Sequence, residues 1–259
     1  MEKNLIKICS LYSGSSGNCT LIKSENAKIL IDAGKSAKAL TIALKNIGED
    51  IGSIDAIFIT HEHIDHVSAL NTLTKKYNIP IHATEGCARE LSLRYEYARP
   101  CIVPHSAYFT EVIGDLTVSS FLTSHDSACP VGYKFTSYDG DTAGLMTDSG
   151  IVTNSAAESL LGCRAVVLEA NHDLSMLRNG PYPHYLKERV ASRFGHLSNS
   201  LSARFAEYLA ENGTKSFLLA HLSAENNTPE IALSTLKSRV LRDGCVFTVA
   251  SPNAQVFME

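Results

Sequence analysis

A dense cluster of metal-binding residue types constrains this chain more than any other feature of its sequence. His61, His63, Asp65 and His66 follow directly on the apolar run at residues 54–60, which predicts a buried strand. In an extended chain His61 and His63 point to the same side. Asp65 and His66 stand where a helix begins and can face a second position, so one segment can supply imidazole and carboxylate ligands to two adjacent Zn²⁺, Mn²⁺ or Fe²⁺ ions. The alternative, a polar loop with several His by chance, fits poorly with only 10 His in 259 residues.

Two metal ions need more than four ligands, so the fold must bring others from elsewhere in the chain. His125, Asp148 and His221 each stand at the end of an apolar run and precede small or polar residues. Strand ends gathered on one rim are where α/β proteins build sites. A lone His or Asp at a strand end is usually structural, but the first cluster requires partners, so we expect these three to be ligands. Asp148 has two carboxylate oxygens and could bridge both ions.

Short apolar runs alternate with helical patterns along the chain, which predicts a layered α/β fold. The predicted strands are residues 7–12, 19–23, 28–32, 54–60, 79–83, a hairpin over 108–121, 132–137, 142–147, 165–170, 216–220 and 246–250. The predicted helices are residues 37–47, 67–77, 85–98, 155–161, 185–194, 200–212 and 229–242. No linker divides the chain, so we expect one domain over residues 1–259, built from two similar halves, about 1–130 and 131–259, in helix, sheet, sheet and helix layers.

Composition narrows the class of protein. Hydrophobic residues make up 44% and charged residues 19%, a globular composition that excludes disorder, collagen and coiled coil. The seven Cys are odd in number and scattered, which favours reduced thiols in a cytoplasmic protein over a disulfide framework. We see no signal peptide and no apolar stretch long enough to span a membrane, so we expect no membrane partner. The net charge of −4 argues mildly against a nucleic-acid protein, although a local groove could be positive.

The order of the seven expected ligands resembles that of the metallo-β-lactamase fold superfamily, over essentially the whole chain. The resemblance implies an α/β fold of the αββα four-layer sandwich type, with a dinuclear site at one edge of two sheets. It also implies how the ligands divide: one ion takes His61, His63 and His125, the other takes Asp65, His66 and His221, and Asp148 and a hydroxide bridge them.

Within that superfamily the chain is most similar to the YycJ/WalJ group. The segments that carry this similarity are residues 13–18, 61–63, 124–126, 168–172 and 195–199. That group is associated with DNA exonuclease activity, so the resemblance implies a hydrolase with two divalent ions, Zn or Mn with Fe as a further option, and DNA as substrate. The chemistry agrees, because two ions about 3.5–4 Å apart lower the pKa of a shared water and clamp both oxygens of an in-line displacement at phosphorus.

Asp65 and His196 are the residues that we expect to be catalytic. His196 resembles the extra histidine that nuclease branches place at the scissile phosphate, where it would bind a phosphate oxygen or protonate the leaving oxygen. The alternative is a capping segment in which Ser198 or Asn199 caps the next helix and His196 is incidental.

Several polar residues are expected to contact substrate. They are Ser13, Ser15, Ser16, Asn18, Asn171, His172, Ser198 and Asn199. Residues 13–18 could cradle a phosphate with backbone N–H groups, or form a plain turn between strands. Residues 178–189 interleave Tyr with Arg and Lys, which suits stacking on bases as well as a solvated amphipathic helix. His82 and His105 have no metal-binding residues near them in the sequence, and we expect them to be structural.

Other functions use the same ligands. A hydrolase of a small ester, thioester or lactam needs the same metals, although such an enzyme gives no reason for the segment around His196. A redox di-iron protein of the same fold or a non-catalytic metal-bound protein is the third reading. The di-iron branch usually carries Glu where this chain has His63, and a non-catalytic protein would not need to keep all seven ligands.

Overall fold

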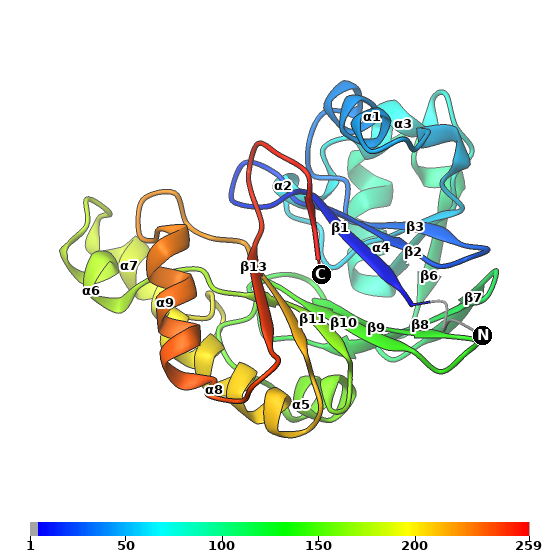
Figure 1. Ribbon diagram of the computed structural model, residues 1–259. Helices are drawn as coiled ribbons and strands as arrows, with labels where there is room; N and C mark the ends of the chain where they lie inside the picture. Colours follow the sequence, from blue (N-terminus) through cyan, green and yellow to red (C-terminus); the bar gives the residue numbers. More distant parts are fainter. Residues whose placement is uncertain (1–4, 259) are drawn as a thin grey trace.

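In the computed structural model, which describes residues 5–258, the apolar runs of the sequence form two seven-stranded sheets (Figure 1). The first sheet has the order β14 (Val256–Phe257), β1 (Lys7–Tyr12), β2 (Cys19–Lys23), β3 (Lys28–Ile31), β4 (Ala56–Phe58), β5 (Ile81–Thr84) and β6 (Ile102–His105). The second has the order β13 (Val246–Val249), β12 (Ser216–Ala220), β11 (Ala165–Glu169), β10 (Thr142–Met146), β9 (Val131–Ser137), β8 (Leu116–Leu122) and β7 (Thr110–Ile113). Strands β3 to β6 are parallel to one another, and so are β10 to β13, so each set ends at a common edge.

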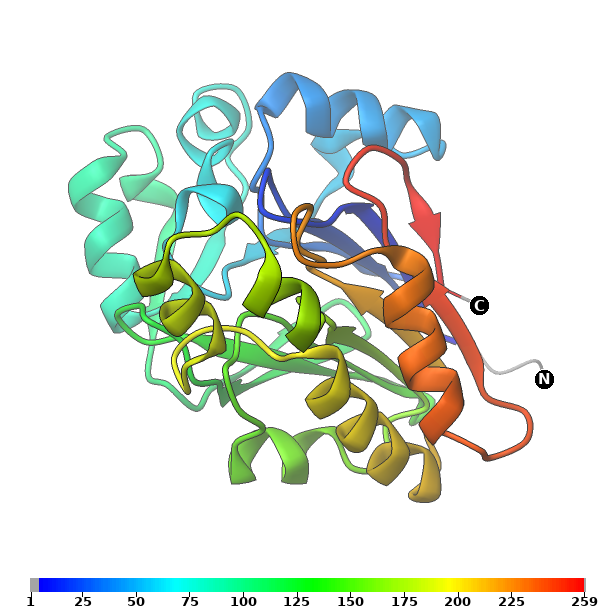
Figure 2. The same ribbon diagram turned by 90° about the vertical axis from the view of Figure 1, so that its left-hand side faces the viewer.

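Helices cover the outer face of each sheet (Figure 1). The first sheet is covered by α1 (Ala37–Asn46), α3 (Leu70–Thr74) and α4 (Glu85–Arg94), and the second by α5 (Asn154–Leu160), α8 (Asn199–Glu211) and α9 (Pro229–Arg239). The remaining α-helices are α2 (Ile64–Val67), α6 (Leu174–Asn179) and α7 (His184–Ala191). Figure 2 shows α6 and α7 together on one side of the two sheets.

Alternating side chains along the strands produce the layers. On β3, Ile29 and Ile31 enter the core between the sheets, whereas Leu30 packs with the helices outside the first sheet. On β12, Leu218 faces the other sheet, and Phe217 packs with the helices outside the second. Three apolar cores therefore separate four layers, and the predicted αββα sandwich is confirmed.

Some elements differ from their prediction. The helix expected over residues 67–77 is two short helices, α2 and α3, and α6, β6 and β14 were not predicted. The chain passes from the first sheet to the second between β6 and β7, before the expected boundary near residue 130, and β14 returns to the first sheet beside β1.

The single domain over residues 1–259 stays a prediction. Among the helices of residues 5–258, none has the length and apolarity that crossing a bilayer requires.

His82 and His105 have partners that the sequence did not suggest. Adjacent parallel strands β5 and β6 place Nδ1 of His82 2.9 Å from Nε2 of His105. Phe58 packs against the first ring and Phe109 against the second, with ring centroids 4.5 and 4.1 Å apart. The two imidazoles share one hydrogen bond, and this bond requires at least one of them to be neutral.

Gly34 lies where the loop after β3 touches the loop that carries the first ligand cluster. Backbone N–H groups of Asn18 and Ala33 donate to the carbonyls of Asp65 and His66 at 2.8 and 2.7 Å. A β-carbon on Gly34 would overlap the carbonyl oxygen of Asp65. The two backbones therefore approach so closely that no side chain fits between them.

We predict that Gly34→Ala moves Asp65 and His66 apart from their partners. Overpacking of this kind costs about 1–3 kcal/mol or more, so the melting temperature falls and less metal is retained. Thermal unfolding and elemental analysis measure the two effects. Gly52→Ala is the control, because its β-carbon would meet side chains rather than backbone, namely the carboxylate of Asp50 and the ring of Tyr77. Equal stability and metal content in both variants would contradict this account of the loop.

We also predict that the histidine pair makes stability depend on pH. Burial lowers the pKa of both His82 and His105, so below about pH 6.5 the unfolded chain takes up protons that the folded chain refuses. Stability is then present above that pH and is lost as the pH falls. His105→Phe should show a smaller drop in melting temperature than wild type between about pH 7.5 and about pH 5.5. Replacing the exposed His184 by Phe should leave the drop unchanged, and an unchanged drop in both variants would refute the prediction.

Candidate metal centre

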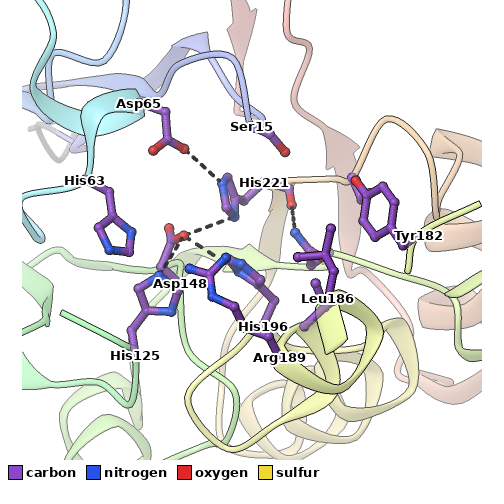
Figure 3. Close-up of a pocket in the computed structure, with 13 residues that line it drawn as sticks. Ser15, His63, Asp65, His125, Asp148, Tyr182, Leu186, Arg189, His196 and His221 are labelled. Carbon is purple, nitrogen blue, oxygen red and sulfur yellow. Dashed lines mark hydrogen bonds and ion pairs between the residues drawn. The ribbon is translucent and has the colours of Figure 1, made fainter. Parts of the chain in front are cut away.

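The expected ligands meet at the edge where the parallel strands of both sheets end (Figure 3). The first cluster follows β4, Asp148 follows β10 and His221 follows β12 directly. A cavity of about 210 Å³ opens there, and its walls include His63, Asp65, His125, Asp148, His196 and His221.

Three site residues share an unusual backbone conformation. Asp32, Asp148 and His221 have φ of 63°, 54° and 55°, and they are the non-glycine residues with positive φ in the described part of the chain. Each follows a strand of a sheet that holds its neighbours in place. Such strain costs about 1–3 kcal/mol per residue and is concentrated at functional sites.

The ligand atoms group as the resemblance implies. One group contains His61, His63 and His125, and a second contains Asp65, His66 and His221, each with its ligand atoms within 4.8 Å of one another. Asp148 belongs with His61 and His66 in a further group of the same size. Asp148 therefore lies next to members of both groups, which suits a bridging carboxylate.

Four of the histidines have one ring nitrogen fixed by an acceptor of the protein. Nδ1 of His66 lies 2.7 Å from Asp32 Oδ2, Nδ1 of His125 lies 3.0 Å from the carbonyl of Gly195, and Nδ1 of His221 lies 2.9 Å from Glu169 Oε1. Nδ1 of His61 lies 3.0 Å from the hydroxyl of Thr60. The Nε2 atoms of His61, His125 and His221 are left for the centre, which is how proteins orient histidine ligands for a metal, whereas that of His66 also lies 3.1 Å from the side-chain nitrogen of Asn18.

Two buried carboxylates in this arrangement were missed by the sequence analysis. Asp32 receives the backbone N–H and the hydroxyl of Thr60 at 2.8 and 2.9 Å, as well as His66. Glu169 accepts from the backbone N–H groups of Ser149 and Leu197 at 3.0 and 3.1 Å. Both stand at or just after the end of an apolar run, the same signal that identified Asp148, and this signal could have found them.

The unpartnered atoms of the site fit a bound cation. Among the described residues, Nε2 of His61, Nε2 of His221 and Oδ2 of Asp148 are buried without a hydrogen-bond partner. Buried polar atoms without partners are costly. His61 and His221 each share a possible metal-binding group with Asp148. All three atoms are of the types that bind Zn²⁺ or Mn²⁺, so the residues present fit a divalent metal centre.

The buried groups of the site shift one another's pKa values. Burial opposes protonation of His66, but Asp148 and Asp32 outweigh it and raise its pKa to about 9. Burial favours the neutral form of Asp148, but His221 and His66 keep its pKa below the usual value. At His61 burial and the surrounding imidazoles lower the pKa far below the usual value, so this ring is neutral and ready to bind a metal.

His196 lies in the same cavity but outside the seven expected ligands. Its Nδ1 lies 2.8 Å from Glu169 Oε1 and 3.7 Å from Asp148 Oδ1. Glu169 thus holds His196 and His221 with one oxygen. Burial raises the pKa of Glu169, but His196 and His221 more than offset this effect and keep it ionised.

The expected substrate contacts fall into different places. Ser15 and Asn171 line the cavity. Asn18 is buried, and its side-chain N–H₂ group lies 3.1 Å from Nε2 of His66 and 3.4 Å from Asp65 Oδ2. The hydroxyl of Ser13 accepts the backbone N–H of His221 at 2.7 Å, so Ser13 and Asn18 support ligands in this structure.

Of the other expected contacts, His172, Ser198 and Asn199 are buried and Ser16 is exposed. Ser198 caps α8 by accepting from the backbone N–H of Leu201, and the buried Asn199 pairs with Asn227. His172 is buried with both ring nitrogens unpartnered, and burial lowers its pKa to about 4. Ser16 accepts from Lys35 at 2.8 Å. Substrate contact by these residues stays a prediction.

Helix α7 closes one side of the cavity with Leu186, Arg189 and Val190, and Tyr182 stands beside them (Figure 3). Arg189 donates to Asp126 Oδ2 at 2.6 Å. The other oxygen of Asp126 lies 3.4 Å from Nε2 of His125. The Arg and Tyr stretch noted in the sequence therefore reaches the candidate centre.

Comparisons with known proteins agree with this geometry. The model of the metallo-beta-lactamase superfamily matches residues 12–130. Exodeoxyribonuclease WalJ of Streptococcus pneumoniae serotype 2 (strain D39) is 36% identical over 238 residues, covering 90% of this chain and 88% of the relative. Exodeoxyribonuclease YycJ of Bacillus anthracis shows the same identity and the same coverage.

A solved structure supports the fold independently. The metallo-beta-lactamase fold protein YhfI from Bacillus subtilis superposes with a TM-score of 0.74 at 17% identity, over 98% of this chain and all of that one (100%). At this identity the likeness shows the fold alone. Together with the close sequence relatives, it leads to one conclusion: the chain belongs to the metallo-beta-lactamase superfamily and, within it, to the WalJ/YycJ-like group.

Proposed function

We propose that this protein is a metal-dependent phosphodiesterase that degrades DNA from its ends, with two divalent ions held by the seven ligands. Relatives at 36% identity are named exodeoxyribonucleases, and their aligned length is nearly the whole chain. Divalent ions bound in such a centre supply a nucleophilic water at neutral pH and compensate charge on phosphate oxygens.

The observation that carries the proposal is the position of His196. His196 is not one of the seven proposed ligands, although it also forms a possible metal-binding group with Asp148, Glu169 and His221. Glu169 fixes its Nδ1, and the side chain remains 17% exposed in the cavity. An imidazole so placed can donate a proton to a leaving oxygen or bind a phosphate oxygen.

Asp65 has the second catalytic role in this proposal. Its Oδ2 lies 3.6 Å from Nε2 of His66 and 3.8 Å from Nε2 of His221, and the side chain remains 22% exposed. Although burial opposes it, contact with His221 and His66 keeps the pKa of Asp65 low, so the carboxylate is ionised at neutral pH. An ionised acceptor at the wall of the cavity can orient the attacking water.

Substrate selection is the role proposed for α7 and the segment before it. Arg189 pairs with Asp126 beside the centre, and Tyr182 offers a ring at the same wall. A phosphate of the DNA strand can take the place of Asp126 on the guanidinium, and the ring can stack on a base. Released from Asp126, Arg189 would give the DNA strand a cation at this wall although the net charge of the chain is −4.

The cellular setting and the domain organisation are part of the same proposal. All seven Cys are free thiols, which supports a reducing cytoplasmic location. The core shared by the two sheets supports one domain across the chain.

We predict that His196→Ala spares metal binding and slows DNA cleavage by about 10²–10⁴-fold, because general acid–base groups contribute that much. The protein, loaded with Mn²⁺ or Zn²⁺, is incubated with end-labelled single- and double-stranded DNA and RNA. Bound metal and melting temperature are measured on the same samples. His105→Phe is the matched control, since it removes an imidazole that lies outside the cluster.

Either of two results would count against this assignment. Near wild-type cleavage by His196→Ala would remove the catalytic role of this residue and favour a small ester as substrate. Loss of metal in the same variant would show that His196 is a ligand.

A further inference from the structure

A second cavity adjoins the metal centre. It has a volume of about 420 Å³ and is formed by four stretches of chain, at residues 13–16, 222–224, 227–229 and 250–252. Ser15 and Ser223 line this cavity and the metal cavity alike. The two spaces therefore adjoin at these two serines, and a ligand held at the metals would reach the second one by passing Ser15 and Ser223. We call this second space the side cavity.

The side cavity is uncharged and largely apolar. Leu222, Ala224, Pro229, Ala250 and Pro252 supply its apolar surface, and no Asp, Glu, Lys, Arg or His contributes to its lining. Such a space gives a phosphate group no cation to pair with. It suits a neutral, flat or apolar group, and its volume falls in the range of about 300–1,000 Å³ that small-molecule pockets occupy.

Most polar groups of the side cavity already have partners within the protein. The hydroxyl of Ser223 accepts the backbone N–H of Asn226 at 3.2 Å, and the hydroxyl of Thr228 accepts that of Ile231 at 3.2 Å. The side chain of Asn227 donates to the carbonyl of Ala170 at 2.8 Å. The polar groups that remain are mainly hydroxyls, which can donate as well as accept and so do not select one base edge, whereas the apolar surface can contact any base face.

We infer that the side cavity binds the base and sugar of the terminal nucleotide while its phosphodiester lies at the metal centre. The inference rests on the proposed function and adds to it where the end of the strand is held. It accounts for the shared Ser15 and Ser223 at the point where sugar joins phosphate. It also predicts that nucleotides carrying any of the four bases are removed at similar rates, since apolar surface and hydroxyl groups do not tell the bases apart.

The test compares DNA ends that carry or lack a base. Metal-loaded wild type is given labelled DNA whose last nucleotide, at each end in turn, is either normal or abasic. We expect the abasic end that enters the cavity to be cleaved about tenfold more slowly or worse, because contact with one base contributes a factor of that order. Ala224→Trp, at an exposed loop position, fills the cavity and should abolish the difference between the two ends.

Leu201→Trp is the matched control, because it places the same indole in a separate hollow on α8, lined by Ile151, Val152 and Phe205. This variant should keep the wild-type difference, and metal content and melting temperature verify that all the variants are folded and loaded. Equal cleavage of normal and abasic ends by wild type overturns the inference and leaves the proposed function intact. Faster hydrolysis of long-chain than of short-chain aryl esters, lost in Ala224→Trp, would assign the side cavity to an acyl group instead. Absence of any DNA cleavage by wild type would refute the proposed function itself, and the inference with it.

Discussion

Two buried carboxylates, Asp32 and Glu169, fix the rings on which the candidate metal centre depends. A carboxylate is costly to bury unless it is paired, and both are hydrogen-bonded to imidazoles that point their second nitrogen into the site. His196 and His221 lower the pKa of Glu169, whereas burial keeps the pKa of Asp32 above its usual value. Asp32 acts from the first sheet through His66, and Glu169 acts from the second sheet through His196 and His221. Each sheet therefore carries its own anchor, and the two anchored sets meet where the parallel strands end.

The rigid sandwich allows this arrangement to tolerate strain. Asp32, Asp148 and His221 adopt left-handed backbone conformations that β-carbons disfavour. Each is held by a strand just before it, and by hydrogen bonds such as that from the backbone N–H of His221 to Ser13 at 2.7 Å. Gly34 contributes in the same way, by letting two loops pass at a distance that excludes any side chain. The apolar cores thus supply the stability with which an unfavourable local geometry is maintained.

The sequence predicted the fold correctly because alternating strands and helices leave a local pattern, whereas the division of the ligands between two ions rests on the family resemblance and stays a prediction. The cluster from His61 to His66 is dense enough to identify a metal site, and strand-end residues such as His221 follow from the need for partners. Asp32 and Glu169 were overlooked because each is a single acidic residue after an apolar run, without a cluster of metal-binding residue types beside it in the sequence. The pairing of His82 with His105 depends on which strands lie side by side, and a lone sequence does not give that order. Strand β14, only Val256–Phe257, is too short to carry any periodic signal.

The most direct test of this account is a titration of Zn²⁺ into metal-free protein in competition with a chromogenic chelator, for wild type and Glu169→Gln. If the buried carboxylate orients His221 for a metal, wild type binds two ions per chain, and the variant binds one of them about 10–100-fold more weakly while remaining folded. A wild type that binds one ion or none, or a variant that binds both ions as tightly as wild type, would contradict it.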